Sequence, residues 1–233
     1  RLLGEMLDPA LIDADLKRRL EGFRSGSGVV RMNVALSELP RFTARPVAGD
    51  HLTSGIIIAP SLDYMDRAYG DARRAGWSAA PIVEMLIPST LDESLAPPGQ
   101  HVASLFAQAF DPELKALGGG ASWDDHRDSV ADLIIDTVDA HAPNFKASVL
   151  ARRVLTPLDL ERELGLIGGD IFHGQLTPDQ LFSARPLLGH GAYRMPVKGL
   201  YLCGSGAHPG GGVSGLPGRN AAREMIRDFR WRR

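Results

Sequence analysis

The sequence predicts an α+β fold in which a mixed β-sheet carries helices on one face. At least four strand-like segments crowd into residues 29–110, and helical segments interrupt them at irregular intervals. A doubly wound parallel sheet would alternate strands and helices regularly, so this pattern favours a mixed sheet. Because 44% of the 233 residues are apolar, the chain can bury a sizeable core.

The first predicted elements are a helix and a strand. The helix begins at Asp8-Pro9, where the aspartate suits the cap and the proline the first turn. Apolar residues then recur at helical spacing, namely Leu11, Ile12, Leu16 and Leu20. Residues 23–28 (FRSGSG) indicate a linker. Residues 29–36 alternate, which predicts a strand with one buried face formed by Val30, Met32, Val34 and Leu36.

The next predicted elements are three strands and a helix. Residues 54–60 (SGIIIAP) predict a buried strand. Ser61 then caps a helix that ends at Gly76. Residues 80–88 predict a third strand. Residues 101–110 predict a fourth, in which alternate positions are Val102, Ser104, Phe106 and Gln108.

The second half of the chain predicts helices with two further strands. A long amphipathic helix follows Ser122 over residues 123–141, and a strand follows over 147–157. Short helices are predicted over 158–164 and 178–184, the latter capped by Thr177. The last strand is residues 199–204. Pro217 then opens a final helix, whose predicted inner face is Ala221, Ala222, Met225 and Ile226.

Composition excludes several functional classes. The net charge of −2 gives no electrostatic reason to expect a nucleic-acid partner. The single cysteine, Cys203, excludes an intrachain disulfide framework, and no His, Asp or Glu set has metal-ligand spacing. No apolar run approaches the roughly 20 residues of a membrane-spanning helix. With no signal peptide at its start, the chain is expected in the cytoplasm, while peripheral membrane contact and a homodimer stay open.

Residues 199–222 (GLYLCGSGAHPGGGVSGLPGRNAA) carry the most informative motif. Gly210-x-Gly212-x-x-Gly215 has the spacing of a dinucleotide fingerprint, which should open the helix of a βαβ unit with an acidic residue about 20 positions further on. Only 18 residues follow Gly215, so no second strand fits. A hydrolase loop is disfavoured, because the chain has no Gly-x-Ser-x-Gly elbow.

A plain turn remains the simplest alternative for this stretch, but its glycine content points to a ligand. Fixing six glycines between residues 204 and 215 is entropically costly. Glycine-rich backbone allows a ligand to approach closely. The helix that follows presents free N–H groups and a partial positive charge, which suit an anion or a carbonyl oxygen.

The same stretch resembles the C-terminal flavin-binding segment of the phytoene dehydrogenase-like family of FAD-dependent oxidoreductases. The similarity extends over most of the chain, including residues 62–76, 78–108, 156–182 and 185–212. The resemblance implies that residues 1–26 are a lead-in helix and linker, 27–185 a substrate domain, and 186–233 a returning strand–helix segment of the FAD-binding domain. The half with the true fingerprint is then absent from these residues.

The resemblance also implies a function. The complete protein would transfer hydride from an organic, apolar substrate to FAD, and the isolated 233-residue chain would be inactive. The alternative is a non-catalytic binding or interaction protein that keeps the fold without flavin. Ser205 favours this alternative, because related flavoproteins often carry an acidic residue there.

Site residues follow from the same resemblance. Gly204 and Ser205 would pass the FAD diphosphate and ribityl chain, and Gly211, Gly212 and Val213 would lie against the flavin pyrimidine edge. His208 completes the cofactor-binding candidates. Candidates for substrate contact or proton transfer are His173, Arg185 and Tyr193. Structural roles stay open for three of them: His173 as a satisfied histidine, Arg185 as a donor to loop carbonyls, and His208 as a brace of its own loop.

Overall fold

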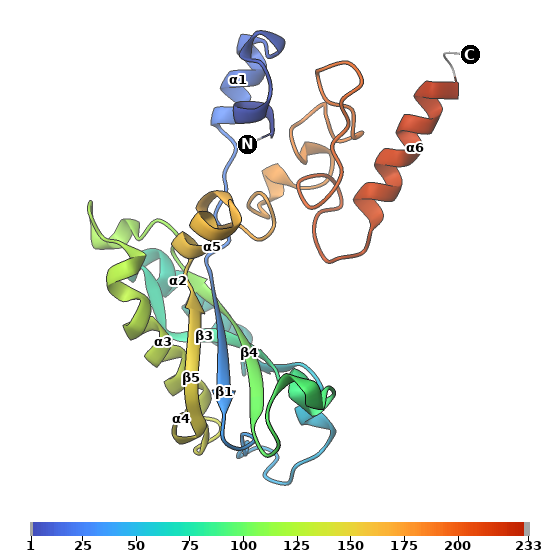
Figure 1. Ribbon diagram of the computed structural model, residues 1–233. Helices are drawn as coiled ribbons and strands as arrows, with labels where there is room; N and C mark the ends of the chain where they lie inside the picture. Colours follow the sequence, from blue (N-terminus) through green and yellow to red (C-terminus); the bar gives the residue numbers. More distant parts are fainter. Residues whose placement is uncertain (1, 231–233) are drawn as a thin grey trace. The chain divides into compact units, whose positions relative to one another are not determined.

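The computed structural model describes residues 2–230, which form two compact units (Figure 1). The sheet unit comprises residues 28–169. The terminal unit combines residues 1–27 with residues 170–233. Each unit is a set of residues that contact mainly one another. The domains expected from the sequence (residues 1–26, 27–185 and 186–233) are divided by function instead, and they remain predictions.

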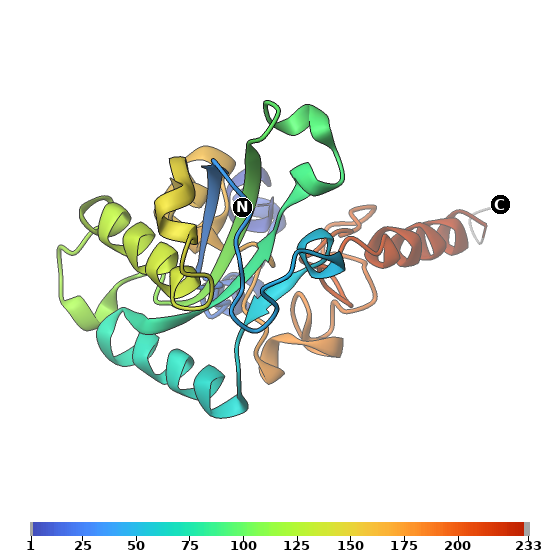
Figure 2. The same ribbon diagram turned by 90° about the horizontal axis from the view of Figure 1, so that it is seen from below.

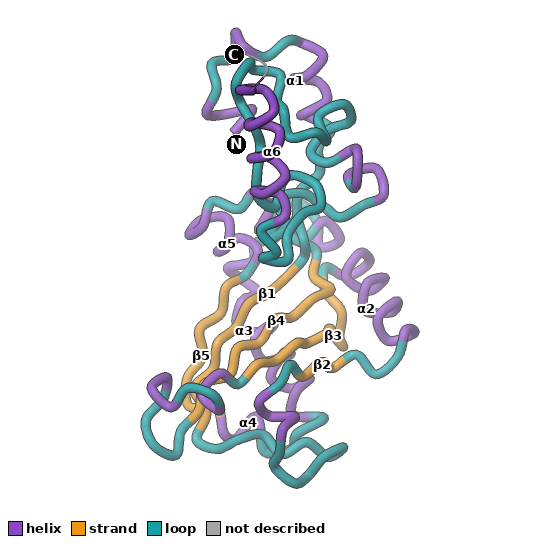
Figure 3. The backbone as a smooth tube through the Cα atoms, turned by 90° about the vertical axis from the view of Figure 1, so that its right-hand side faces the viewer, coloured by secondary structure: helices purple, strands orange, loops and turns teal. Residues whose placement is uncertain are grey.

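The sheet unit is built on five strands in the order β2-β3-β4-β1-β5 (Figure 3). The strands are β1 Val29–Leu36, β2 Ile56–Ile58, β3 Trp77–Leu86, β4 His101–Phe110 and β5 Val149–Leu155. The α+β class is confirmed, and every strand pair is antiparallel rather than mixed. The alternation in β1 explains this, because one-sided burial is typical of antiparallel sheets.

One face of the sheet packs against α3 (Trp123–Asp139), which begins at the predicted cap Ser122. The predicted buried face of β1 is confirmed, since Val30, Met32, Val34 and Leu36 are all 2% exposed or less. Helix α3 contributes a matching stripe, formed by Val130, Ile134 and Val138. These residues form the main core of the unit.

The other face of the sheet is half-buried and partly polar. Ser104 Oγ donates to Asn33 Oδ1 at 2.8 Å, and Arg31 lies over the Phe106 ring at 5.9 Å. The core face of β4 is therefore formed by Ala103, Leu105 and Ala107. The alternate residues named from the sequence (Val102, Ser104, Phe106 and Gln108) lie on the open face. The register decides this, because Leu105 pairs with buried Met32.

Helices α2, α4 and α5 complete the sheet unit, and Figure 2 shows α2 and α3 from below. As predicted, α2 (Leu62–Ala75) is capped by Ser61 and ends at Gly76. Helix α4 spans Phe145–Ser148, and α5 (Pro157–Leu164) begins in a capping box. The strand predicted within 54–60 is confirmed as β2, but it is a three-residue edge strand that is only partly buried: Ile58 is 5% exposed, whereas Ile57 is 64% exposed on the open face opposite Glu84.

Short helices connect these elements. The 3-10 helices are Pro9–Leu11, Asp50–Thr53, Pro88–Thr90, Glu93–Leu95, Lys115–Leu117, Ile167–Gly169, Pro178–Gln180 and Phe182–Ala184. A π-helical turn spans Leu2–Met6. The helix predicted over 178–184 is thus two 3-10 turns, because Leu181 between them is extended.

The terminal unit contains α1 (Ala14–Glu21) and α6 (Leu216–Arg230). The single helix predicted from Asp8 is divided: Asp8 caps the 3-10 turn, Ile12 is extended, and Asp13 caps α1. The two segments of the unit are joined by side chains. Arg24 Nη2 contacts Asp179 at 2.7 Å, and the Gln180 side chain bonds both the N–H and the carbonyl of Arg24.

Two predictions for the C-terminal region are wrong. Residues 199–204 form no strand, and only Tyr201 makes a bridge, with Arg194. A strand needs a continuous series of hydrogen bonds to a neighbouring strand. Within residues 2–230, this segment has only the single bridge to Arg194. On α6, Ala221 is buried as predicted, but Met225 and Ile226 are 38% and 51% exposed and Ala222 is exposed. The inner face instead carries polar groups, because Asp228 pairs with Arg194.

Gly28 offers a test of the sheet unit. Its φ of +62° is left-handed, and an added Cβ would lie 2.1 Å from the Phe110 carbonyl oxygen. Gly28→Ala should therefore lower the free energy of unfolding by at least the roughly 1–3 kcal/mol of backbone strain, measured by urea denaturation. Gly119→Ala is the control, because no atom lies within 4 Å of its added Cβ. Equal denaturation midpoints for the two variants would contradict this account.

Candidate functional site

Arg185 draws together the loops of the candidate site in the terminal unit. Its side chain is fully buried. Nε and Nη2 donate to the Ser205 carbonyl at 3.0 and 2.6 Å, and Nη2 also donates to the Phe172 carbonyl at 2.5 Å. A longer bond of 3.4 Å joins Nη1 to the Gly174 carbonyl. The guanidinium therefore joins the 172–174 turn to the glycine-rich loop. Donation to loop carbonyls is the structural role that the sequence left open for Arg185.

The charge of Arg185 is balanced mainly by peptide dipoles. Burial lowers the pKa of its guanidinium, and the nearby Asp170 carboxylate partly opposes that shift. An arginine stays protonated at neutral pH even so. The Asp170 oxygens are already occupied, because they accept the backbone N–H groups of Gly26, Phe172 and Gly174 at 2.8–3.1 Å. A buried positive charge thus lies directly behind Ser205.

Asp170 is a site residue that the sequence analysis missed. It is 1% exposed, and it shapes the turn that carries His173. The available signal was an aspartate directly after two glycines, a combination typical of turns in which a carboxylate accepts nearby N–H groups. That signal is local, and it contains no information about Arg185.

Tyr193 braces the glycine-rich loop against α6. Its ring is buried, and its φ is +69°. The hydroxyl donates to the His208 carbonyl at 2.9 Å and accepts from Asn220 Nδ2 at 2.8 Å. The His208 ring is half-buried, 6.3 Å from the Phe182 ring. Tyr193 thereby fixes the loop backbone at His208, which is a positioning role.

His173 lies on the exposed side of the same region. Its φ is +57°, and its N–H donates to the Asp170 carbonyl at 3.2 Å. A Cβ added to Gly206 would lie 4.0 Å from the His173 Cβ, so the turn and the loop are neighbours. Within residues 2–230 no hydrogen bond engages its imidazole, which leaves the ring available to a ligand.

The glycine-rich loop presents exposed backbone. Gly204 and Gly212 have φ values of +100° and +101°, and an added Cβ at either position would meet no atom within 4 Å. Gly211 and Val213 are exposed as well. Across residues 2–230 no hydrogen bond engages the N–H groups of residues 211–215. A row of open N–H donors beside a buried cation suits a phosphate or carbonyl oxygen.

The chain is similar to known proteins in both fold and sequence. No protein-family model matches the chain. The fold resembles an oxidoreductase structure from Methanosarcina mazei, with a TM-score of 0.51 and 16% identity over 96% of this chain and 39% of that one. Phytoene desaturase (lycopene-forming) from a Paracoccus species is 29% identical over 61% of this chain and 27% of its own length. The chain is thus similar to a phytoene desaturase over part of both lengths, and the structural likeness at 16% identity bears on the fold alone.

A second relative is more similar in sequence. The pyridine nucleotide-disulfide oxidoreductase domain-containing protein 2 of Mus musculus is 47% identical over 220 residues, which are 91% of this chain. The resemblance stated from the sequence is confirmed. The chain spans 37% of that relative's length.

Within residues 2–230, no helix is both long and apolar enough to cross a bilayer. In the same residues, no group of three or more His, Cys, Asp or Glu side chains is placed to hold a metal ion. The donors at the candidate site are instead peptide N–H groups and a buried cation.

Replacing Arg185 tests this assembly. Arg185→Met would leave the carbonyls of Phe172 and Ser205 without their donor, at about 1–3 kcal/mol for each buried group. Amide hydrogen exchange should then accelerate in segments 170–176 and 203–210 while the sheet unit keeps its protection. Arg223→Met on the exposed surface of α6 is the control and should change neither segment. Unchanged exchange in both variants would show that the guanidinium does not hold the loops.

Proposed function

We propose that this chain forms the substrate-domain and flavin-loop part of an FAD-dependent oxidoreductase that transfers hydride from an organic, apolar substrate to flavin. The observation that carries the proposal is the row of open N–H groups at residues 211–215 beside the Arg185 cation. When bound, FAD supplies the hydride acceptor. The chain's own residues bind and orient it.

The cofactor contacts in this proposal are mainly from the backbone. Gly204 and Ser205 hold the diphosphate, and exposed glycine backbone permits the close approach that this requires. The uncharged Ser205 side chain does not repel an anion. Two hydrogen bonds from Arg185 to the Ser205 carbonyl polarise the Ser205–Gly206 peptide, which strengthens the Gly206 N–H as a donor.

Gly211, Gly212 and Val213 hold the flavin ring edge in the proposal. Their N–H groups direct partial positive charge at the ring oxygens, which favours the negative charge of a reduced flavin. His208 is a weaker cofactor candidate, because its carbonyl is already fixed by Tyr193. Its half-buried ring shapes the loop beside Phe182.

Substrate contact in the proposal falls to His173. Its exposed imidazole stands beside the loop at Gly206, where it can hold or move a proton. Arg185 and Tyr193 act as positioning residues, because their polar atoms are engaged by carbonyls and by Asn220. Hydride transfer depends chiefly on orientation of the cofactor, so the proposal requires no dedicated base.

The proposal divides the activity between this chain and the remainder of a longer protein. The chain spans 37% of the length of its mouse relative, and the dinucleotide fingerprint is absent from residues 1–233. The isolated chain is then inactive and flavin-free. With one cysteine and no disulfide framework, the proposal places the protein in a reducing compartment such as the cytoplasm.

A chimera tests the proposal. The part of the mouse relative that matches this chain is replaced by residues 1–233, and the purified chimera is compared with the isolated chain after incubation with FAD. Visible flavin absorbance is expected in the chimera alone. Gly212→Val in the chimera should lower the flavin content, since a β-branched residue is strained at a φ of +101° and covers the open backbone.

The matched control is Gly120→Val, a sheet-unit glycine with a similar φ of +103° and open space around it. It should leave flavin content unchanged. A folded chimera without flavin would reject the oxidoreductase proposal and favour the binding-protein alternative that Ser205 suggests. Flavin retained by the isolated chain would reject the division of the site between two parts.

A further inference from the structure

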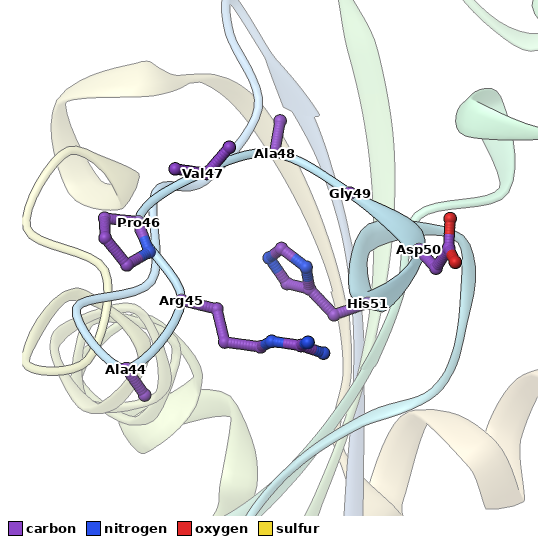
Figure 4. Close-up of a pocket in the computed structure, with 8 residues that line it drawn as sticks. All are labelled: Ala44, Arg45, Pro46, Val47, Ala48, Gly49, Asp50 and His51. Carbon is purple, nitrogen blue, oxygen red and sulfur yellow. The ribbon is translucent and has the colours of Figure 1, made fainter.

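A loop of the sheet unit, far in sequence from the glycine-rich loop, borders a solvent-open pocket of about 400 Å³. Residues 44–51 line it (Figure 4). Both ends of the loop are anchored in the core by Phe42 and Leu52, which are 8% and 4% exposed. The Thr43 N–H and hydroxyl also donate to the His141 carbonyl, at 2.9 and 3.2 Å. Both ends of the exposed loop are therefore anchored to the rest of the sheet unit.

Two basic side chains point into this pocket. Arg45 and His51 extend toward each other from opposite sides of the loop, whereas the Asp50 carboxylate points outward (Figure 4). The His51 ring is held by an edge-on contact with Phe42, with centroids 6.3 Å apart and planes at 77°. Asp50 is the acidic residue of the lining, so no carboxylate faces the basic pair from within it.

The Arg45 guanidinium has no partner among the described residues. No ion pair or hydrogen bond engages it within residues 2–230, while Arg41 contacts Glu38 at 3.4 Å. The N–H groups of Val47, Ala48 and Gly49 likewise make no hydrogen bond within the described chain. The lining thus offers donors from three sources: a guanidinium, an imidazole and open peptide N–H groups.

We infer that this loop binds an oxyanion, a phosphate or carboxylate group carried by a small organic molecule. A guanidinium engages either group through two parallel hydrogen bonds. The imidazole and the peptide N–H groups can donate to the remaining oxygens. A volume of about 400 Å³ falls within the usual range of small-molecule pockets. This site shares no residue with the proposed flavin loop.

The test is an NMR titration of the 233-residue chain with inorganic phosphate and, separately, with succinate. Saturable shifts of the His51 ring protons and of the Arg45 Nε–H are expected with at least one of them. Arg45→Gln should weaken that binding by roughly tenfold, the loss expected when one charge-assisted pair is removed. Tighter binding of phosphate would assign a phosphorylated ligand, and tighter binding of succinate a carboxylic acid.

Arg41→Gln is the matched control, because it removes the same charge from an exposed arginine outside the lining. It should leave the dissociation constant within about twofold. Equal weakening of anion binding by Arg41→Gln and Arg45→Gln would show that only the net charge of the protein matters, and it would overturn the inference. The absence of saturable shifts with both anions would also overturn it. His51→Gln, a second variant, should weaken binding without moving the melting temperature.

Discussion

The buried guanidinium of Arg185 is the contact on which the candidate site depends. A buried ion is tolerated only when its hydrogen-bonding capacity is filled. Here carbonyl oxygens of Phe172, Gly174 and Ser205 accept its donors, while Asp170 directs its carboxylate at peptide N–H groups. The cation and the anion therefore each organise a stretch of backbone. They do not simply neutralise each other through a direct bond.

This arrangement explains how a unit with little apolar core holds its shape. Its buried cluster is small, formed by Tyr193, Ala207 and Ala221 with Leu202 packed against it. Polar contacts supply the remaining order. Asp228 on α6 binds both Arg194 and the Tyr201 hydroxyl, and the carboxylates of Asp228 and Glu224 raise the pKa of Arg194. Apolar residues of α6 such as Ile226 and Phe229 consequently remain exposed.

Elements specified by interactions between neighbouring residues were predicted correctly, whereas those that depend on contacts between distant segments were not. Strand β1 and helix α2 were predicted well, because alternation, a serine cap and a terminal glycine are local signals. The strand at 199–204 and the inner face of α6 were wrong, because a strand and a buried helix face both need a partner from elsewhere. A role for Arg185 as a donor to loop carbonyls was among the alternatives, but Asp170 and the identity of the carbonyls that Arg185 binds escaped prediction for the same reason. Their pairing joins segments that sequence spacing does not relate.

The glycine-rich loop and the 44–51 loop present positive potential in opposite ways. In the first, the cation is buried and the exposed surface is peptide backbone, which favours an extended ligand lying along many N–H groups. In the second, the Arg45 and His51 side chains themselves point into a pocket, which in our inference favours a compact group between two side chains. Under the proposed function, the polarised peptide N–H groups are the donors to the cofactor at Ser205, where related flavoproteins often carry an acidic residue. Ser205 therefore decides between the flavin-binding proposal and its alternative, because the peptide donors must hold the cofactor without a charged anchor at that position.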